Sequence, residues 1–552
     1  MSASKRTISA AEFGAKPENK NNATELRNAV IACRGRKGVT LVIAPGVYHF
    51  RDEQAVELRD EVISGGFGPA FERFMFYPYA PYVKGLDFSS CDGVTVQAEG
   101  VTLLCEGWME PVSLDRCKNV TIRGLSIDYL PKPFSVGKIV AQDGKSCDVE
   151  IDPAYPITQG TQMSRTLFWN VTANHLVRHV LWPGKEYLGP QKVKLTGQPP
   201  TEPGEILAMI THTLHFRPAI LINEAENITL DHVTIHAQPG MGIVGNRGHN
   251  ITLDHLQVIP SPDLHFSTNT DATHFTACTG TLLFDHCRIE GQADDSTNIH
   301  GYYQTIVQVI EETKDSVKVK LRVDAPTGTH AQVLDYPDAG DELELVELDT
   351  LKPVQTFKVT SVQPFPQDWN CVVTLAGKLP KDIDRYMIAD ITRMPRVIIR
   401  NSHFINNAGR ILIKSRNVLI ENNVIEDVLG SGVFVGAEAS WKEGFTSTDV
   451  VVRGNTLQNC GAGITVVLDA KDKTAVGVHK RIVIENNLID GYPASDGILV
   501  TNAEDVTIRG NIIAGCKPGI KIMHSRRIHV GNNPGGQVEV GPGVSDLHEG
   551  AY

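Results

Sequence analysis

A short strand-and-bend unit recurs along this chain of 552 residues. The clearest copies are NITLDHVTI from Asn227 and NITLDHLQV from Asn250, 23 residues later, followed by TLLFDHCRI from Thr281. In each copy apolar, often β-branched residues alternate with polar ones, and Asn, Gly or Asp marks a bend. One such unit cannot bury its apolar face alone, but coils of roughly 20 to 30 residues stacked about 4.8 Å apart share one core. The pattern therefore predicts an all-β protein, a right-handed parallel β-helix.

More divergent copies extend the array in both directions. They are VTVQAEGVTLL from Val94, VTIRGLSI from Val120, VIIRNSHFI from Val397, VLIENNVI from Val418, VVVRGNTL from Val450, IVIENNLI from Ile482 and VTIRGNII from Val506. The rival repeat fold is a leucine-rich horseshoe, which needs fixed leucines and one helical side per repeat. Val, Ile and Asn occupy those positions here, so we favour the β-helix.

The N-terminal segment predicts a cap over the first coil. EFGAKPENKNNATELRNAVIAC reads as a turn and then a helix with Leu26, Val30 and Ile31 on its apolar face. A strand pair around Pro45 and Gly46 follows. A cap is expected there because an open end of the ladder would expose an unpaired strand.

Two stretches lack the repeat. They contain alternating strands such as SVKVKLRV and TFKVTSV with charged or Pro/Gly turns, which predicts small antiparallel β-barrels inserted into the β-helix. Insertions of this kind can wall off a site on an open β-helix face. We divide the chain into cap and first coils (1–131), a barrel-like insertion (132–216), central coils with the site (217–301), a second barrel-like insertion (302–395) and C-terminal coils (396–552).

Composition excludes several classes of partner. The formal net charge of −12 disfavours nucleic acid and anionic membrane surfaces, since both need a basic patch. No apolar run approaches the roughly 18 to 20 residues that span a bilayer. Ten cysteines without tight CxxC pairs fit neither a disulfide framework nor a zinc ribbon, so Cys278 and Cys287 are interpreted as buried thiols. A neutral, sugar-like partner fits better.

Carboxylates fall on neighbouring coils of the predicted stack. Aligning NTDATHF from Asn269 with DDSTNIH from Asp294 places Asp271 next to Asp295, with Asp294 to one side. Like charges about 4.8 Å apart raise one another's pKa and destabilise the fold unless they are used or neutralised. An extra loop, PSPDLHFST, immediately precedes this cluster, and binding residues tend to gather on such loops. We therefore interpret the three aspartates as functional.

Another aspartate column has a different interpretation. LDH recurs at Asp231, Asp254 and Asp285, at the bend of three successive copies. Asp caps turns by bonding nearby backbone groups, so this column is predicted to be structural.

Glycoside hydrolysis usually requires a pair of carboxyl groups. One protonates the departing oxygen, and the other activates water or attacks the anomeric carbon. Asp271 on one coil and the Asp294/Asp295 pair on the next supply both. If the side chains point away from each other, about 6.5 to 9.5 Å would separate the carboxyl groups. That distance leaves room for a water molecule and is typical of inverting enzymes, so we expect inversion.

Two glycoside hydrolase families resemble this region. The motifs NTD (269–271), DD (294–295) and RILIK (410–414) are similar to the polygalacturonases of family 28, although that family's separate Gly-His-Gly is absent. The closer resemblance is to family 110, the bacterial exo-acting α-1,3-galactosidases that cleave blood group B and linear α-galactosyl epitopes. NTDATHFTACTGTLLFDHCRIEGQADDSTNIHG, from Asn269 to Gly301, is similar to that family's central motif almost throughout. The β-helix with inserted barrels also matches.

The family 110 resemblance implies roles for the carboxylates. It implies Asp271 as the general acid and Asp294 or Asp295 as the base, with inversion and without a metal or other cofactor. The implied partner is a galactosylated oligosaccharide or glycoconjugate. Because that substrate lies outside the cell, we expect a secreted or periplasmic enzyme whose signal peptide has been removed. The fold pattern leaves open whether the chain is a monomer or a homodimer.

The loop GAEASWKEGF and the strand before it hold candidates for binding a sugar. Trp441 is a candidate platform for a sugar ring, with loop packing as the alternative, and Glu438 is a candidate acceptor for a hydroxyl. Arg410 and Lys414 are either substrate contacts or charge partners of the aspartates on a solvated face.

Polar residues beside the aspartates are further candidates. His274 and His300 could donate to a sugar hydroxyl or hold a carboxylate, although a lone His on a strand is more often structural. Asn269 and Asn298 are either turn residues or ligands for hydroxyls.

Two functions from other classes stay open at this point. Many β-helices are polysaccharide lyases that use Asp-bound calcium with an Arg or Lys base, but the acidic net charge disfavours an anionic polymer. A non-catalytic adhesin, in which the aspartates only decorate the coils, is the other alternative.

Overall fold

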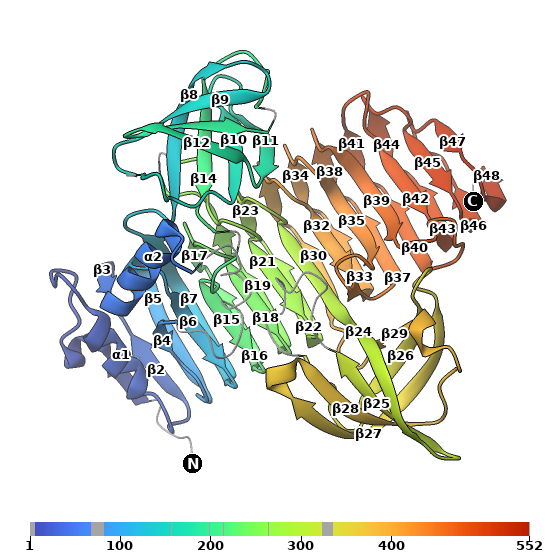
Figure 1. Cartoon of the computed structure of the whole chain (residues 1–552), viewed down its shortest axis with the longest axis horizontal. Coiled ribbons are helices and arrows are strands. Elements are labelled where there is room, and N and C mark those ends of the chain that lie inside the picture. Colours follow the sequence, from blue (N-terminus) through green and yellow to red (C-terminus); the bar gives the residue numbers. More distant parts are fainter. Residues whose placement is uncertain are drawn as a thin grey trace.

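The body of the molecule is a parallel β-helix with two smaller all-β units attached to it (Figure 1). It is seen in a computed structural model that describes residues 6–67, 82–155, 157–197, 199–213, 215–262, 264–322 and 335–550. Within these residues no helix is long and apolar enough to cross a membrane. The predicted fold class is confirmed.

The coils form three stacks of parallel strands. The first stack runs through β1 (Arg6–Ser9), β2 (Val39–Val42), β5 (Val94–Glu106), β7 (Lys118–Tyr129), β16 (Glu226–Asp231), β19 (His249–Asp254), β22 (Thr279–Asp285), β30 (Arg396–Arg400), β33 (Arg416–Glu421), β37 (Thr448–Arg453), β40 (His479–Glu485), β43 (Ala503–Arg509), β46 (Arg526–Val530) and β48 (Ser545–Glu549). The second begins at β3 (Gly46–Arg51), shares the long β5 and β7, and continues through β17 (Thr234–Ile235), β20 (Gln257–Val258), β23 (Arg288–Glu290), β31 (His403–Ile405), β34 (Val424–Glu426), β38 (Thr456–Gln458), β41 (Leu488–Asp490) and β44 (Ile512–Ala514).

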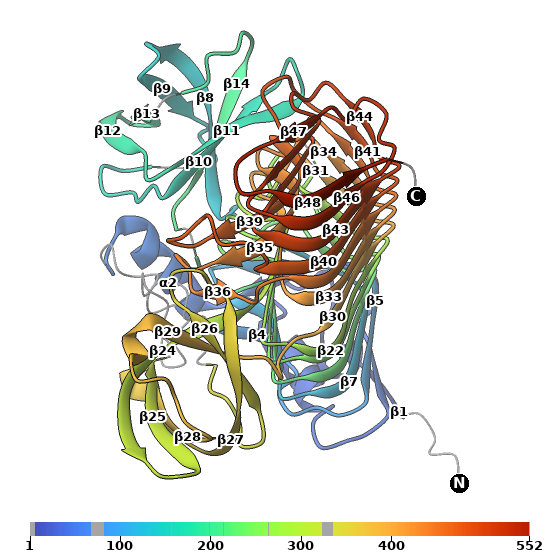
Figure 2. The same ribbon diagram turned by 90° about the vertical axis from the view of Figure 1, so that its right-hand side faces the viewer.

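The third stack leads to the aspartates of the predicted site. It runs through β4 (Lys84–Asp87), β6 (Glu110–Asp115), β15 (Ile220–Asn223), β18 (Ile243–Asn246), β21 (Thr273–Thr276), the start of β24 (Thr297–Glu312), β32 (Ile411–Lys414), β35 (Ser431–Glu438), β39 (Ala462–Asp469), β42 (Ile498–Thr501), β45 (Ile520–Met523) and β47 (Val538–Val540). Figure 2 shows the three-sided coils stacked one on the next.

The repeated sequence units stack in the register that their alignment predicts. Ile228 of β16 pairs with Ile251 of β19, and Leu253 of β19 pairs with Phe284 of β22. The alternating apolar residues of these strands point inward and are almost completely buried. One continuous core, which burial of this apolar area stabilises, therefore runs through the coils.

The LDH column is a bend, as predicted. Asp231, Asp254 and Asp285 lie in register, and the histidine after each has a positive φ between 52° and 56°. The rings of these histidines stack, with centroids 4.3 and 4.9 Å apart. This column lies in the first stack, away from the aspartates on the third.

An asparagine ladder holds the C-terminal coils together at another bend. The backbone N–H of Asn423 donates to Oδ1 of Asn455 at 3.0 Å, and the backbone N–H of Asn455 donates to Oδ1 of Asn487 at 3.0 Å. Nδ2 of Asn455 also donates to the carbonyl of Ile420 at 3.0 Å. The ladder satisfies backbone groups that would otherwise be buried without partners. Asn511 and Asn533 continue it.

The N-terminal segment contains the predicted helix and one that the pattern did not reveal. Helix α1 (Ala23–Ile31) buries Leu26 and Val30 next to β3 and β4, but Ile31 is 52% exposed, so it was wrongly placed on the apolar face. The second helix, α2 (Glu53–Ser64), begins at Asp52, whose carboxylate caps it. The short helix η1 (Ala10–Phe13) precedes α1.

The first inserted unit is one antiparallel sheet of seven strands. Its strands are β8 (Phe134–Gln142), β9 (Ser146–Ile151), β10 (Arg165–Asn170), β11 (His175–Leu181), β12 (Gly184–Gly189), β13 (Lys192–Thr196) and β14 (Ile206–Thr211), in the order β11-β10-β14-β8-β9-β13-β12. Among the described residues no pairing joins the outer strands β11 and β12. This unit is therefore a sheet with two open edges, whereas we expected a barrel.

The second inserted unit is a closed barrel, as expected. Its strands are the second half of β24, β25 (Ser316–Arg322), β26 (Glu342–Glu347), β27 (Pro353–Phe365), β28 (Asn370–Ala376) and β29 (Tyr386–Asp390), with short helices η2 (Pro366–Asp368) and η3 (Ile383–Arg385). Pairings run β24-β25-β28-β27-β26-β29 and return to β24. The start of β24 belongs to a coil, so one strand joins the barrel to the β-helix.

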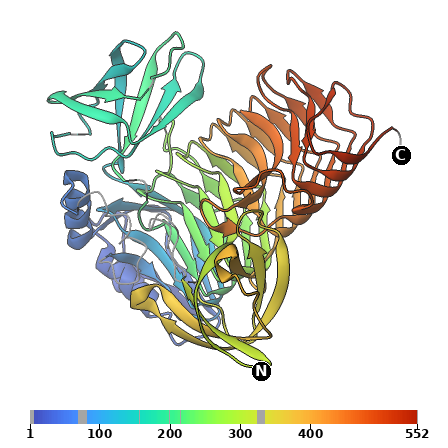
Figure 3. The same cartoon turned by 45° about the vertical axis from the view of Figure 1, so that its right-hand side comes forward.

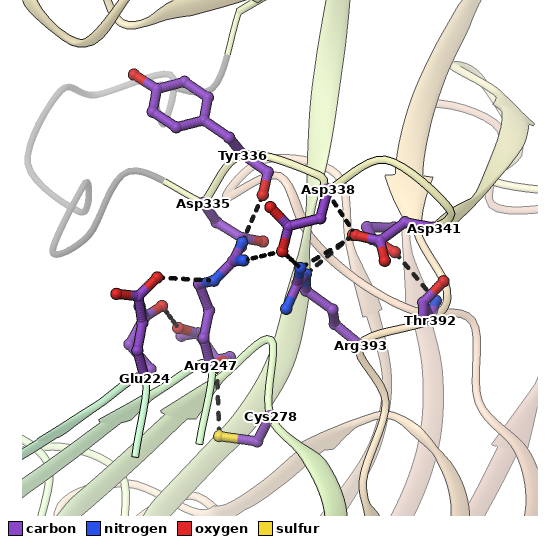
Figure 4. Close-up of polar contacts among 12 residues, drawn as sticks. Glu224, Arg247, Cys278, Asp335, Tyr336, Asp338, Asp341, Thr392 and Arg393 are labelled. Atoms are coloured by element: carbon purple, nitrogen blue, oxygen red, sulfur yellow. Dashed lines mark hydrogen bonds and ion pairs between the residues drawn. The ribbon is translucent and has the colours of Figure 1, made fainter. Parts of the chain in front are cut away.

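Ion pairs fasten the barrel to the coil stack (Figure 4). Arg247, at the bend after β18, bonds Asp335 at 3.1 Å and Asp338 at 2.6 Å. Arg393 bonds Asp338 at 2.5 Å and Asp341 at 3.1 Å, so Asp338 bridges the two guanidinium groups. Positive and negative side chains alternate along this partly buried network, which holds the barrel in place on the coils. Figure 3 shows this barrel and the first inserted unit flanking the coil stack.

Candidate active site

The three aspartates meet in the middle of the third stack, just before strands β21 and β24 begin. Phe275 pairs with Ile299 between β21 and β24, and the backbone N–H of Ala272 donates to the carbonyl of Asp295 at 3.0 Å. Carboxylate oxygens of Asp271, Asp294 and Asp295 lie within 4.8 Å of one another. The alignment of NTDATHF with DDSTNIH is therefore the register of the structure.

A pocket of about 380 Å³ opens over this cluster. Its floor and one wall come from the coils, through Met241, Asp271, His274, Asp294, Asp295, Asn298, Arg410, Leu412 and Glu438. The opposite wall comes from the first inserted unit and the segment after it, through Arg165, His179, Leu181, Trp182 and His215. The loop between β35 and β36 (Glu443–Gly444) adds Trp441 and Glu443.

Eight of the residues proposed from the sequence line this pocket and three do not. Asn269, His300 and Lys414 are buried outside the lining, so their side chains do not face the open space. Nδ2 of Asn269 donates to the carbonyl of Pro133 at 3.2 Å, so this side chain joins the coil to the start of the first inserted unit. Asn298 does line the pocket, and its Oδ1 has no hydrogen-bond partner among the described residues, so it is available to a sugar hydroxyl.

The pattern did not reveal the pocket residues of the inserted unit. Arg165 and Trp182 belong to a sheet whose docking position cannot be read from local alternation. One clue was present: RTLFWN is an apolar strand that begins with a charged residue, and Arg165 is indeed only 5% exposed. Glu443 was missed because Lys442 and Glu443 read as an ordinary surface pair.

The pKa values of the three carboxyl groups are shifted in different directions. Burial alone would raise the pKa of Asp294, but the charge and hydrogen bond of Arg165, at 2.6 Å, bring it below the usual value. Burial raises the pKa of Asp295 to about 7, despite hydrogen bonds from the backbone and side chain of Arg410 at 2.8 and 3.1 Å. Burial and the charge of Asp294 raise the pKa of Asp271 well above its usual value. Asp294 therefore ionises at lower pH than Asp271 and Asp295, which keep their protons to higher pH.

A chain of hydrogen bonds explains which atom holds the proton of Asp271. Nδ1 of His300 faces the carbonyl of Gly301 at 2.9 Å, and a carbonyl only accepts, so this nitrogen carries hydrogen. Burial lowers the pKa of His300 to about 3 and that of His274 to about 4, so both rings are neutral. Nε2 of His274 must then donate to Nε2 of His300, 2.8 Å away. This leaves Nδ1 of His274 as an acceptor, and the bond to Oδ2 of Asp271, at 2.7 Å, takes its hydrogen from the carboxyl group.

A second network lies behind the wall formed by the C-terminal coils. Nζ of Lys414 donates to Glu438 at 2.6 Å and to Glu443, and these two carboxylates keep the pKa of Lys414 above its usual value although burial opposes them. Nδ2 of Asn298 donates to Glu443 at 3.2 Å, and Arg410 lies 3.5 Å from Glu438. Lys414 therefore positions two acceptors that line the pocket rather than touching the open space itself.

Among the described residues, three groups of side chains have the composition of a metal site; one, Asp254, His255 and His286, lies in the bend column of the first stack, and the other two lie at the pocket. Of those two, the three aspartates form one, and His274, His300 and Glu443 form the other, with ligand atoms within 4.8 Å in each. Cationic side chains already bind both groups, since Arg165 and Arg410 hold two of the aspartates and Lys414 holds Glu443. Residues of the chain therefore balance part of the negative charge of both groups.

The chain is similar to several known proteins. Residues 386–545, which span the C-terminal coils, match the family described as "Periplasmic copper-binding protein (NosD)". A relative named "Alpha-1,3-galactosidase B" from Bacteroides thetaiotaomicron is 26% identical over 489 residues, covering 83% of this chain and 76% of the relative. "Alpha-1,3-galactosidase A" from Bacteroides fragilis is 26% identical over 524 residues, covering 88% of this chain and 83% of the relative.

Solved structures with β-helices are also similar, at lower identity. The Family 28 exopolygalacturonase of Yersinia enterocolitica is 12% identical, with a TM-score of 0.43, and the match covers 100% of this chain and 78% of the other. A score this low supports no argument about function. The sequence relatives, by contrast, cover 83% and 88% of this chain. Most of this chain is thus homologous to proteins named alpha-1,3-galactosidase, and the resemblance drawn from its central motif is confirmed.

Proposed function

We propose that this protein is an exo-acting, inverting glycoside hydrolase that releases terminal α-1,3-linked galactose from blood group B or linear Galα1-3Gal glycans. Relatives named alpha-1,3-galactosidase support a glycosidase that acts on galactose. The observation that carries the proposal is the cluster of Asp271, Asp294 and Asp295 on the pocket floor, in which the pKa of Asp271 is raised and that of Asp294 is lowered. Acid and base catalysis of glycoside hydrolysis needs that division.

The proton distribution assigns the roles. Burial and the charge of Asp294 raise the pKa of Asp271, which favours it as the general acid that gives its proton to the glycosidic oxygen as the bond from that oxygen to the anomeric carbon breaks. Asp294 is ionised beside Arg165 and acts as the base, taking a proton from the attacking water. Asp295 is held by Arg410 and, when ionised, adds negative charge close to the oxocarbenium-like transition state.

Exo action fits the shape of the site. The floor lies between the coils and the inserted sheet, which supplies Arg165, His179 and Trp182 to the facing wall. Such a pocket accepts the end of a glycan, whereas a groove open at both ends would accept its middle. Inversion rests on the family resemblance, because the 4.8 Å limit between the nearest carboxylate oxygens is closer than the roughly 6.5 to 9.5 Å that leaves room for a water.

The test is hydrolysis of Galα1-3Gal and of the fucosylated blood group B trisaccharide, followed by proton NMR. We expect β-galactose as the first product. Asp271→Asn and Asp294→Asn should each lower kcat/KM by roughly 10²- to 10⁴-fold, as loss of an acid or base does. Asp254→Asn, in the bend column outside the pocket, is the matched control and should keep full activity. Release of α-galactose would refute inversion, and no release from either sugar would refute the proposed substrate.

A better leaving group separates the two roles. A dinitrophenyl galactoside needs little protonation, so Asp271→Asn should retain much of its activity on this substrate. Asp294→Asn should not, because water still needs a base. The opposite result would exchange the two assignments.

A further inference from the structure

The pocket changes in character from floor to mouth. Asp271, Asp295 and Asn298 on the floor are 4 to 6% exposed, whereas Leu181 and Trp182 at the inserted sheet are 47% and 58% exposed. The carboxylates act at the bond of the terminal galactose, so that sugar must occupy the floor. The next sugar then lies at the mouth, against the exposed apolar residues.

Trp182 is held rigidly at this mouth. It follows β11 directly, and its φ of 48° lies in the left-handed region, which bulky residues rarely adopt. Its backbone N–H donates to the carbonyl of Ser164 at 2.8 Å, and Pro183 comes next in the chain. Strained backbone of this kind persists where the surrounding structure requires it, and it is concentrated at functional sites.

Trp182 is also tied to the catalytic cluster through the sheet. Leu181, the residue before it, pairs with Arg165 across β10 and β11, and Arg165 holds Asp294. The position of the indole relative to the base is thus fixed by one pair of neighbouring strands. Movement of the inserted sheet would displace both together.

We propose that Trp182 is the platform for the sugar that carries the cleaved galactose, which makes the first inserted unit the part of the protein that selects the substrate. This inference rests on the proposed function. An indole offers a large flat apolar face to the C–H side of a sugar ring, and leaving such a face exposed at a pocket has no structural benefit. Trp441, 40% exposed, lines the same pocket from the loop between β35 and β36.

The test compares substrates with and without a second sugar. For Trp182→Ala we expect the KM for Galα1-3Gal to rise about 3- to 10-fold, as the loss of one ring-stacking contact predicts. The kcat/KM for α-galactosyl fluoride, which has no second sugar, and the inhibition constant of free galactose should stay within about twofold of wild type. Trp182→Phe should restore most of the affinity for the disaccharide. Leu188→Ala, an exposed apolar residue on β12 of the same sheet outside the pocket lining, is the control.

Each outcome decides a separate point. If galactose and the fluoride weaken in parallel with the disaccharide, Trp182 contacts the terminal galactose and the proposal is wrong. Unchanged kinetics on every substrate would also overturn it. A misfolded Trp182→Ala is recognised by its thermal unfolding, and the ratio of substrates measured for Trp182→Leu, which keeps an apolar side chain but no flat ring, then decides. Wild-type turnover of the two substrates tests the proposed function independently, because that result does not depend on Trp182.

Discussion

Replacing Arg165 tests whether Asp294 is the base. Arg165 is 5% exposed and donates to Asp294 at 2.6 Å, so Arg165→Met removes a buried hydrogen bond between charged groups. Such a bond contributes about 1.5 to 3 kcal/mol, which corresponds to a loss in kcat/KM of about 10- to 150-fold if it stabilises the reactive form of the base. Removing the guanidinium also leaves burial to raise the pKa of Asp294. A base works only when ionised, so the acidic limb of the pH profile should move to higher pH.

The assay is galactose release from Galα1-3Gal from about pH 4 to pH 9, with kcat/KM plotted against pH. Arg165→Lys keeps the positive charge and should leave the acidic limb in place with a smaller loss of rate. Lys192→Met, at a solvent-facing position on β13 of the same sheet, is the matched control for loss of one positive charge. An acidic limb that stays put in Arg165→Met, at unchanged thermal stability, would refute the assignment of Asp294.

Other predictions concern the proton chain, the barrel joint and the ladder. His274→Phe removes the acceptor that stabilises protonated Asp271, so the alkaline limb of the same pH profile should move to lower pH, and an unmoved limb would contradict the direction of the hydrogen-bond chain. Burial and a hydrogen bond with Asp341 raise the pKa of Asp390 to about 8. The folded state therefore binds a proton that the unfolded state has lost, and stability should fall as the pH rises. Between about pH 6 and 8 Asp390 alone should lower the free energy of unfolding by about 2 to 3 kcal/mol, so urea titrations of Asp390→Asn should show a fall that is smaller by that amount. Asn455→Leu leaves buried backbone groups without partners and should lower the free energy of unfolding by about 2 to 5 kcal/mol, whereas an unchanged urea midpoint would show that the ladder adds no stability.

The stacking of Asp271 and Asp295 could be predicted because a β-helix turns sequence spacing directly into position. Every coil repeats the same alternation of apolar residues, so aligning two copies gives their register, as the pairing of Phe275 with Ile299 shows. The same logic placed His274 at the cluster. It did not show that His300 and Lys414 point behind the pocket wall, since two faces of one strand are distinguished by packing rather than by spacing.

Residues contributed by the inserted units could not be predicted in the same way. Alternation reveals the strands of the first unit but not where its sheet docks on the coils. The sequence therefore could not show that Arg165 binds Asp294 or that Trp182 lines the pocket. Closure was equally hidden: the two units share the same local pattern, yet only the second returns to its first strand. Closure depends on tilt and strand number across the whole sheet, which no short stretch of sequence encodes.

Both inserted units leave the coil stack and rejoin it without disturbing its register. Val120 pairs with Ile228 across the first, and Leu282 pairs with Val397 across the second. The coil stack therefore holds the three aspartates in place whatever is inserted between its strands. The inserted units can be exchanged without changing the register of the coils. A descendant of this chain can trade one inserted unit for another and acquire a new preference among glycans without rebuilding the machinery that breaks the bond.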